Sequence, residues 1–359
     1  MKNLILYCIA IIFLSSSACN NKKMNSILDL FDSKRILEST IFEFQNTTED
    51  ILNPTALVTN GKLLVALNLK TNFLFSGIDT KNERLINNWG DIGQGPCELI
   101  GVLDFYKNYL NNGVNAWDPI SKKLMFYSFD SIPDGKYLST CRNLLDINFN
   151  KDLMNMFYPK MIQLDESLFF ALGNSKGKRF TLFDISNNQV VSIGEYPDKD
   201  NNEHIVEYIR TQAYNGNIRY NNKIRKIAYI SSNSELFEIY SIENNLINLE
   251  YRNQTTIPNY SQEDMSLELN KTEGSVGRNN CLTISNDKIF ILYQEYSFIV
   301  DKNKNLNEAN IILVFDWNGN PIQMYQLDCA VTYIEFDEIN NRIYAIRDNP
   351  DPQIIYFDL

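Results

Sequence analysis

Few residues in this sequence could perform nucleophilic or acid–base chemistry. The chain has 359 residues, of which one is a histidine, His204, and 44 are aspartate or glutamate. A Ser-His-Asp triad would have to use His204, but no G-x-S-x-G turn accompanies it. His204 also lies in a polar run, which is typical of an exposed loop. The sequence therefore gives no support to hydrolysis by an activated serine.

Carboxylate pairs could perform a different chemistry, because glycoside cleavage uses two acids that flank the scissile bond. Such a pair is the basis of one alternative function, an envelope glycan hydrolase or lyase. With 44 acids in the chain, a set chosen by residue type has little specificity. Six of them could approach the mouth of the channel expected below: Asp118, Glu195, Glu235, Glu263, Glu295 and Asp348.

Metal and phosphate sites have little support in the sequence. Zinc sites need closely spaced Cys and His ligands, and no such spacing occurs. Asp198-Lys199-Asp200 is only a fragment of a calcium loop. The glycine-rich segment Gly90–Pro96 lacks the lysine and hydroxyl of a nucleotide-binding loop and precedes β-structure, which favours a structural turn. We expect neither a metal nor a cofactor.

Aromatic and basic residues in three long segments, 139–160, 196–225 and 252–281, are better candidates for a site. Tyrosine rings beside arginines suit a sugar, a peptide or a protein partner. The alternative is that each tyrosine packs its segment against the body of the fold. The candidate ligand-binding residues are Tyr158, Tyr208, Tyr214, Arg219, Tyr220 and Arg278.

The N-terminus indicates export. Lys2 is followed by the apolar run 4–14 and then by small residues, as in a secretory signal peptide. The segment Ser16-Ser17-Ala18-Cys19 resembles a bacterial lipobox, although serine replaces the usual leucine three positions before the cysteine. We expect cleavage after residue 18, lipidation of Cys19 and a tether over residues 19–34, with an ordinary secretory peptide as the alternative. Acyl chains would then hold the protein at a membrane.

The overall charge argues against nucleic-acid binding. The formal net charge is −11, and removal of residues 1–18 takes away only Lys2, which makes it −12. Nucleic-acid binders need a clustered basic surface.

The remaining cysteines, Cys97, Cys141, Cys281 and Cys329, are widely spaced. Four cysteines allow three pairings, and free thiols are equally compatible with the sequence.

A repeat determines the architecture that must position these residues. Six times an apolar strand is followed by another strand that ends in an aromatic or aliphatic residue and, usually, aspartate. Repetition at about 40–50 residues is typical of β-propeller blades. The apolar strands are 63–67, 114–117, 168–172, 227–230, 289–293 and 342–346. The strands that follow end at Ile78-Asp79, Phe129-Asp130, Phe183-Asp184, Tyr240-Ser241, Phe315-Asp316 and Phe357-Asp358.

We therefore expect one all-β domain over residues 35–359, a six-bladed β-propeller of four-stranded antiparallel blades. The last blade has three strands before the chain stops, so residues 38–45 should supply its outer strand and cover an exposed sheet edge. Asn318-Gly319 predicts a hairpin turn. Two segments, 29–37 and 261–270, could each form a short helix.

A family resemblance agrees with this architecture. The segment Trp89–Leu99, WGDIGQGPCEL, resembles the G-x-G-Q-G-P-G-E-F signature of TolB-like six-bladed propeller lipoproteins of Gram-negative gut bacteria. The C-terminal Ile355–Leu359 resembles the last strand of those proteins. Here Cys97 replaces the usual glycine and Leu99 the usual phenylalanine. The resemblance implies a propeller and export, and it implies no defined activity.

The expected location of a site follows from blade topology. In a four-stranded meander, the loop between the second and third strands and the connection to the next blade share one face, on which the long segments gather. Long loops are often functional. We therefore expect a non-catalytic binding module of the cell envelope that binds a protein partner or an oligosaccharide. We expect a lipid to anchor it, and the outer membrane to be the membrane concerned. A structural or assembly lipoprotein is the other alternative.

Overall fold

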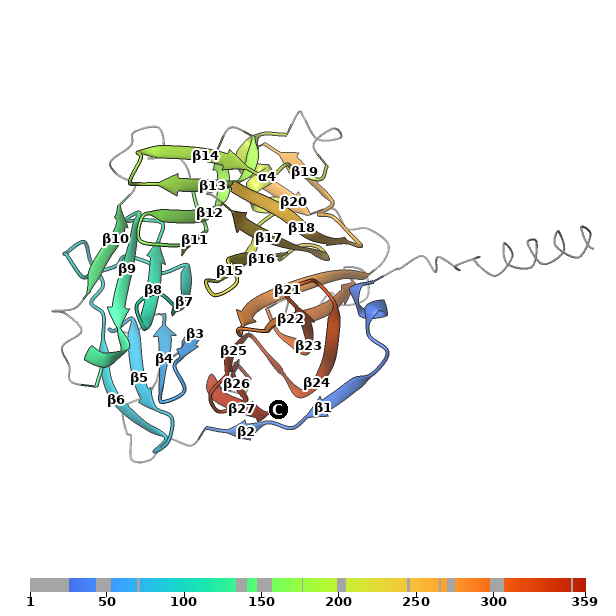
Figure 1. Cartoon of the computed structure of the whole chain (residues 1–359). Helices are drawn as coiled ribbons and strands as arrows, with labels where there is room; N and C mark the ends of the chain where they lie inside the picture. The colour runs from blue at the N-terminus through green and yellow to red at the C-terminus, as the bar shows by residue number, and fades with distance from the viewer. Residues whose placement is uncertain are drawn as a thin grey trace, which may run out of the picture.

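A computed structural model describes most of the chain, with its placed residues falling in twelve ranges. These ranges are 26–42, 53–69, 72–133, 141–146, 157–175, 177–198, 205–243, 246–264, 266–269, 275–297, 307–349 and 351–359. Cys19 and His204 lie outside the described residues, as does the expected signal peptide. Six sheets surround a central axis like the blades of a propeller, with the first strand of each blade nearest the axis (Figure 1).

Blades one to three follow one another along the chain. Blade one contains β3 (Pro54–Thr59), β4 (Leu63–Asn68), β5 (Phe75–Asp79) and β6 (Arg84–Trp89). Blade two contains β7 (Asp104–Asn108), β8 (Gly113–Asp118), β9 (Lys123–Ser128) and β10 (Arg142–Asp146), with a 3-10 helix η2 (Phe129–Ser131) after β9. Blade three contains β11 (Lys160–Gln163), β12 (Leu168–Ser175), β13 (Lys178–Asp184) and β14 (Gln189–Ile193).

The later blades carry additional elements between them. Helix α4 (Glu207–Ala213) precedes blade four, which contains β15 (Gly216–Asn221), β16 (Lys226–Ser231), β17 (Leu236–Glu243) and β18 (Leu246–Gln254). A hairpin of β19 (Tyr260–Glu263) and β20 (Ser266–Leu269) precedes blade five, which contains β21 (Ser275–Ile284), β22 (Lys288–Ser297), β23 (Ala309–Asp316) and β24 (Pro321–Val331). Blade six contains β25 (Tyr333–Asp337), β26 (Arg342–Arg347) and β27 (Gln353–Asp358).

The predicted repeat is confirmed. The six apolar segments lie in the second strands of the six blades, and five of the six predicted ends lie in the third strands. The exception is Phe129-Asp130, which lies in η2 directly after β9. Where aspartate ends a third strand, its carboxylate often orders the turn that follows. Asp79 accepts hydrogen bonds from the backbone N–H groups of Lys81 and Asn82 at 3.0 and 3.1 Å. Asp316 does the same for Asn318 and Asn320.

Aromatic side chains fill the spaces between neighbouring blades. Ring centroids of Phe75 and Phe105 lie 5.5 Å apart between blades one and two. Three further ring pairs lie between blades three and four, four and five, and five and six. They are Phe180–Tyr229, Phe237–Phe315 and Phe290–Phe336, with centroids 5.3, 5.0 and 4.4 Å apart. Such pairs contribute about 0.5–1.5 kcal/mol each beyond the burial of apolar area. The core is therefore a ring of interfaces between blades.

The N-terminal segment closes the ring, as expected. Strand β2 (Thr40–Ile41) pairs antiparallel with β27, with Thr40 opposite Tyr356, and the N–H of Phe42 donates to Ile354 O at 3.0 Å. A second contact was not expected: β1 (Lys34–Leu37) pairs parallel with β24 and becomes a fifth strand of blade five. The N-terminal chain thus joins the last two blades.

Residues 26–34, which we expected to belong to the tether, pack on the propeller. The 3-10 helix η1 (Ile27–Leu30) begins after Ser26, whose hydroxyl donates to Glu235 at 2.8 Å. The N–H of Ile27 donates to the same carboxylate at 3.0 Å, and the Ile27 side chain is buried. The packed domain therefore includes residues before position 35, from Ser26 at least.

Both short-helix predictions are wrong. Segment 29–37 contains the end of η1 and then β1. The backbone of β1 is extended because its hydrogen bonds are made with β24. Segment 261–270 contains parts of a hairpin, which reverses at Asp264 with a φ of 52°. Helix α4 was not predicted. None of the helices in the described ranges is long and apolar enough to span a bilayer.

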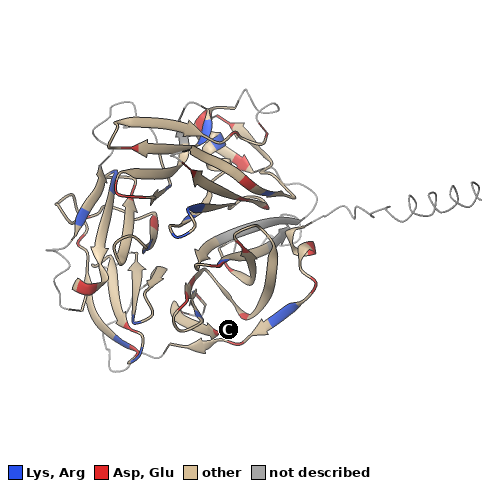
Figure 2. Cartoon of the chain, in the orientation of Figure 1, with Lys and Arg blue, Asp and Glu red and all other residues tan. Residues whose placement is uncertain are grey.

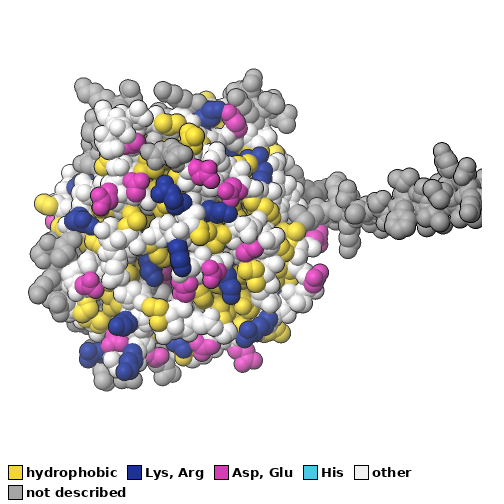
Figure 3. Space-filling model, viewed as in Figure 1, with side chains coloured by type: hydrophobic (Ala, Val, Ile, Leu, Met, Phe, Trp, Pro, Cys, Tyr) yellow, Lys and Arg dark blue, Asp and Glu magenta, His cyan; other side chains and the backbone are white. Residues whose placement is uncertain are grey.

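Charged residues are distributed around the ring rather than gathered in one region (Figure 2). On the face shown in Figure 3, basic and acidic side chains alternate with apolar ones. Neither sign of charge dominates the described part of this face.

Candidate functional site

The two faces of the ring differ in the connections that they carry. We call one of them the insertion face. It is formed by the loops between second and third strands and by the connections between blades, of which the structure describes 90–103, 194–198, 205–215, 255–264 and 266–269. The opposite face carries mostly tight turns. One exception was not expected: the 13 residues between β9 and β10 connect a third strand to a fourth, so this long connection belongs to the opposite face.

A cavity of about 390 Å³ opens the central channel at the insertion face. All six blades contribute to its wall, mainly through the first residues of their inner strands. We call it the channel mouth and define it by its lining residues: Thr55, Ala56, Leu67, Leu69, Val102, Leu103, Asp104, Phe105, Lys160, Asn217, Arg219, Ser232, Asn307, Thr332 and Tyr333. Its volume falls within the range of small-molecule sites.

Three charged residues meet in the channel mouth. Arg219 Nη1 lies 3.1 Å from Asp104 Oδ1, and Lys160 Nζ lies 3.6 Å from the same oxygen. Lys160 also donates to Leu103 O at 2.7 Å. Burial alone would lower the pKa of Arg219, but the adjacent Asp104 charge raises it, so the guanidinium stays charged. The mouth therefore holds two cations against one anion.

The other end of the channel is narrow. Arg219 lines both ends, and beyond it the remaining cavity is about 20 Å³, which suits about one water molecule. Tyr109, from blade two, donates to Ile284 O of blade five at 3.4 Å. The narrow end thus offers room for little more than a water molecule, whereas the insertion face opens into the cavity of about 390 Å³.

Four of the six predicted ligand-binding residues are buried: Arg219 and Tyr220 are each 8% exposed, and Tyr158 and Tyr214 still less. The side chains of Tyr158 and Tyr214 are each 1% exposed. Tyr158 packs edge-on against Phe183, with centroids 5.3 Å apart, and Tyr214 packs against Tyr196 at 5.2 Å. These tyrosines hold long connections against the blades, as the alternative interpretation stated.

The other four predicted residues are placed differently from one another. Arg219 and Tyr220 lie on the inner strand β15 rather than in a loop. Arg219 lines the channel mouth, whereas Tyr220 lines the narrow end. Tyr208 is half exposed on α4. The backbone of Arg278 belongs to β21, and its side chain lies outside the described residues.

The six candidate acids do not converge on the mouth. Asp118 is buried and accepts from the N–H of Ile100 at 2.6 Å and from the Ser121 hydroxyl at 2.7 Å. Glu235 binds the N-terminal segment, and Glu195 pairs with Lys178. Glu263 is exposed in β19, and the Glu295 side chain is outside the described residues. The four of these acids whose side chains are described here, Asp118, Glu195, Glu235 and Glu263, hold the fold or face solvent.

Asp348 is the exception among these acids. Thr332, which lines the mouth, lies with its hydroxyl 3.4 Å from Asp348 Oδ1. Burial and then the charge of Glu308 raise the pKa of Asp348. Among the six candidate acids, Asp348 is the one whose described surroundings, partial burial and a second carboxylate, fit acid–base chemistry.

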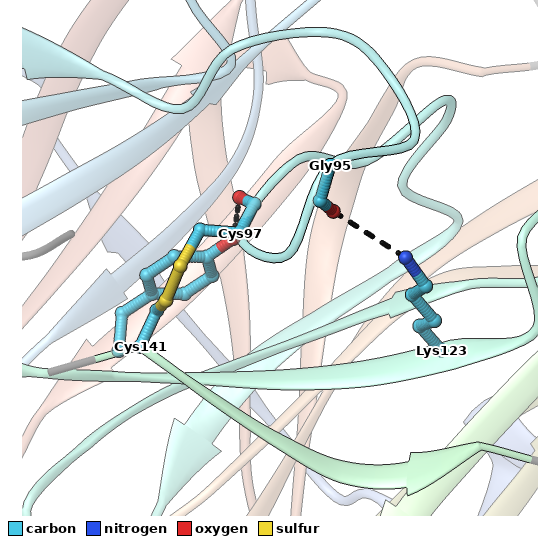
Figure 4. Close-up of a disulfide and its surroundings, with 5 residues drawn as sticks. Gly95, Cys97, Lys123 and Cys141 are labelled. Carbon is cyan, nitrogen blue, oxygen red and sulfur yellow. Dashed lines mark hydrogen bonds between the residues drawn. A yellow bond between two sulfur atoms is a disulfide. The ribbon is translucent and has the colours of Figure 1, made fainter. Parts of the chain in front are cut away.

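The glycine-rich segment is a structural turn, as predicted. Glu98 Oε2 accepts a hydrogen bond from the N–H of Gly95 at 2.8 Å. The Glu98 carboxylate therefore uses a backbone donor that a bound anion would need. A Cβ atom at Gly95 would lie 2.7 Å from Glu98 Cδ, which explains the glycine. Lys123 donates to Gly95 O at 3.4 Å (Figure 4). The segment thereby fastens the connection from blade one to blade two.

A disulfide joins this turn to the outer strand of blade two. Cys97 and Cys141 are bonded, with their Cα atoms 6.1 Å apart, and the Tyr127 hydroxyl donates to Cys97 O at 3.2 Å (Figure 4). Cys281 and Cys329 are free thiols. Burial raises the pKa of Cys281 to about 11, so its thiolate is scarce at neutral pH.

The described residues contain no group of three His, Cys, Asp or Glu side chains that could hold a metal.

Asp104 and Lys160 were missed as candidates. Asp104 is the first residue of the inner strand of blade two, and Lys160 is the first residue of the inner strand of blade three. Arg219 lies on the inner strand of blade four. A charged residue at corresponding positions of first strands was the signal that could have revealed them. Attention to the long segments alone pointed to the insertion face but not to the cavity.

The architecture agrees with what comparison with known proteins finds. The family model described as TolB-like 6-blade propeller-like matches residues 36–339, so the chain belongs to this family of six-bladed β-propellers. No curated protein matches the sequence.

Two solved structures show the same fold at low identity. A protein from Bacteroides fragilis that is assigned as exported shares 12% identity and a TM-score of 0.53, with 91% of this chain and 96% of that chain covered. A member of the DUF4221 family from Bacteroides vulgatus shares 12% identity and a TM-score of 0.57, with 91% and 98% covered.

Proposed function

We propose that this protein is an exported binding module of the cell envelope, and that its ligand engages the insertion face at the channel mouth. The observation that carries the proposal is the mouth itself: about 390 Å³, lined by all six blades, with charged, polar and apolar groups converging. Ligand sites combine an apolar wall with a few placed polar groups. The partner is a protein or an oligosaccharide of the envelope.

Export and anchoring belong to the same proposal. The signal-like segment before Cys19 and the likeness to an exported Bacteroides fragilis protein both favour an envelope location. A lipid on Cys19 would hold the ring at a membrane, and we propose the outer membrane. Only six residues separate Cys19 from Ser26, the first described residue of the packed domain, so an extended spacer would reach roughly 25 Å at most.

Anchoring is tested by Cys19→Ser. Membrane fractionation should find the wild-type protein with membranes and the variant in the soluble fraction. Persistence of the variant with membranes, resistant to carbonate washing, would mean that something other than an acylated Cys19 holds the protein there.

Binding is tested by capture of the detergent-solubilised full-length protein from its own envelope, with bound proteins and glycans identified. Leu103→Glu places a charge at the mouth, where the Leu103 side chain is half exposed. Ile339→Glu is the matched control, because Ile339 is an exposed aliphatic residue in a turn of the opposite face. A stoichiometric partner should be lost with Leu103→Glu and kept with Ile339→Glu. Capture that is unaffected by Leu103→Glu would overturn the location of the site.

The alternative is a glycan hydrolase or lyase, and the carboxyl group of Asp348 is the observation that favours it. The pKa of Asp348 is raised by burial and by Glu308, as a general acid requires. Incubation of the captured glycans with wild-type protein and with Asp348→Asn decides the matter. Cleavage by the wild type that disappears in the variant would establish the enzyme; intact glycans with both would exclude it for those substrates.

A further inference from the structure

The channel mouth carries an excess of positive charge. Lys160 and Arg219 face one carboxylate, Asp104, and every other residue that lines the cavity is uncharged. Their side chains are only 19% and 9% exposed, so water compensates this excess charge incompletely. In a protein with a net charge of −11, the main cavity is thus suited to an anion.

The wall of the mouth is divided by polarity. Blades one and two contribute apolar side chains, namely Ala56, Leu67, Leu69, Val102, Leu103 and Phe105. The remaining blades contribute the two cations and polar groups, among them Asn217, Ser232, Asn307 and Thr332. A ligand that fills the mouth would therefore place its anionic end toward blades three and four and an apolar body toward blades one and two.

One acceptor in the mouth lacks a donor among the described residues. Asp104 is 1% exposed, and its Oδ2 atom is buried without a hydrogen bond, whereas Oδ1 faces Arg219 and Lys160. A buried acceptor without a donor is destabilising. Oδ2 is enclosed in this structure, so a ligand donor reaches it when the Asp104 carboxylate turns toward the mouth, and that donor would then lie within a few ångströms of the cations. The ligand should therefore carry an N–H or O–H group next to its anionic group.

Building on the binding role proposed above, we propose that the channel mouth binds an organic carboxylate with an adjacent N–H or O–H donor and an apolar body. The residues that line the mouth have an excess charge of +1, which Glu335 on the far side of Arg219 offsets in part, and this excess favours a ligand with one carboxylate. The donor satisfies Asp104 Oδ2, and the apolar body covers the wall of blades one and two. A free N-acylated hydrophobic amino acid and the C-terminal residue of a polypeptide share this chemistry.

Calorimetric titration of the detergent-solubilised full-length protein tests the ligand class. The probes are N-acetyl-L-leucine, its uncharged amide, 4-methylpentanoate, which lacks the N–H donor, and the tripeptide Gly-Gly-Leu. We expect N-acetyl-L-leucine to bind at least tenfold more tightly than its amide and more tightly than 4-methylpentanoate. Tighter binding of Gly-Gly-Leu would assign the site to polypeptide C-termini, and equal or weaker binding to free acids.

Lys160→Gln locates the site without leaving a buried carboxylate unpaired, because Arg219 still faces Asp104. A charge-assisted hydrogen bond lost to the ligand should weaken binding of N-acetyl-L-leucine roughly tenfold. Lys178→Gln is the matched control, since Lys178 also forms an ion pair in blade three but does not line the mouth. Each variant is first checked for an unchanged melting temperature.

Equal binding of the acid and its amide, no binding of either, or an unchanged affinity in Lys160→Gln would overturn the carboxylate proposal. The envelope-capture experiment separates this failure from failure of the binding role. A captured partner that is lost with Leu103→Glu but insensitive to Lys160→Gln would leave the binding role standing and remove only the ligand class.

Discussion

Single residues in this propeller divide between those that hold the blades together and those that open into the channel. Sequence reasoning ranked tyrosines highly because their rings suit ligands, yet Tyr158 and Tyr214 are buried. Residue type alone does not distinguish a ring that packs a connection from a ring that faces solvent, because both need the same aromatic surface. Arg219, one of the candidates, lines the channel mouth, although it lies in a strand and not in the expected loop.

A buried ion pair between blades three and four should be the most sensitive residue-scale contact. Arg179 Nη2 lies 2.9 Å from Glu238 Oε1 and donates to the Tyr240 hydroxyl at 3.0 Å, and both charged side chains are almost fully buried. Glu238→Ala leaves the guanidinium without its main partner. We expect a loss of about 3–5 kcal/mol in the free energy of unfolding, measured by urea denaturation.

The matched control is Glu250→Ala, which removes an ion pair with Lys226 on the partly exposed outer strand of the same blade. That change should cost less than about 1 kcal/mol. Equal losses in the two variants would mean that burial does not determine the importance of these pairs.

Glu335 should make stability depend on pH. It is buried at the narrow end of the channel, where Thr283 donates to it at 2.9 Å, and burial raises its pKa to about 7. Because the folded state keeps this proton up to a higher pH than the unfolded state, the group stabilises the fold at low pH. Its contribution decreases as pH rises from about 4.5 to 7.

Glu335→Gln should remove that contribution. Urea midpoints at pH 5 and pH 7.5 measure it: between these values, wild-type stability should fall relative to that of the variant. The variant keeps a hydrogen-bond acceptor for Thr283, so a general loss of structure is not expected. Parallel pH profiles for the two proteins would show that Glu335 titrates normally.

At the scale of elements, the repeat predicted the second and third strands well, because each second strand is buried on both faces and therefore apolar. Short connections and Asx-type turns gave further boundaries. Elements outside the repeat were predicted poorly. Strand β1 has no partner nearby in sequence, and its parallel pairing with β24 across some 290 residues leaves no local pattern.

The closing strand should matter more than its few residues suggest. Phe42 is buried against Tyr344 and Tyr356, with centroids 6.0 and 6.5 Å apart. Phe42→Ala should cost about 3–5 kcal/mol in thermal or urea unfolding, as a truncated core aromatic does. Ile36→Ala, in β1 and mostly exposed, is the control and should change stability by less than about 0.5 kcal/mol.

The Cys97–Cys141 bond should stabilise the joint between blades one and two. It closes a segment with a sequence separation of 44 residues. Restriction of the unfolded chain predicts a contribution of about 2–4 kcal/mol. The double variant Cys97→Ser/Cys141→Ser should therefore unfold at lower urea concentration than the wild type, and reductant should shift the wild type only. Identical midpoints with and without reductant would indicate that the bond does not form in the isolated protein.

The whole molecule is a closed ring whose two ends differ in width. The period of the repeat predicted the ring and its closure by residues 38–45. The channel mouth could not be predicted, because its residues come from all six blades and are separated by up to about 280 positions in the chain. Their proximity depends on the angle between blades, which no local sequence pattern specifies.

The central claim, that a ligand engages the insertion face at the channel mouth, is tested most directly by site-specific photo-crosslinking in intact cells. A benzophenone side chain is placed at position 103, at the mouth, or at position 339, on the opposite face. We predict a discrete crosslinked species from position 103 and none from position 339. Crosslinking at position 339 alone, or equal crosslinking at both, would contradict the account.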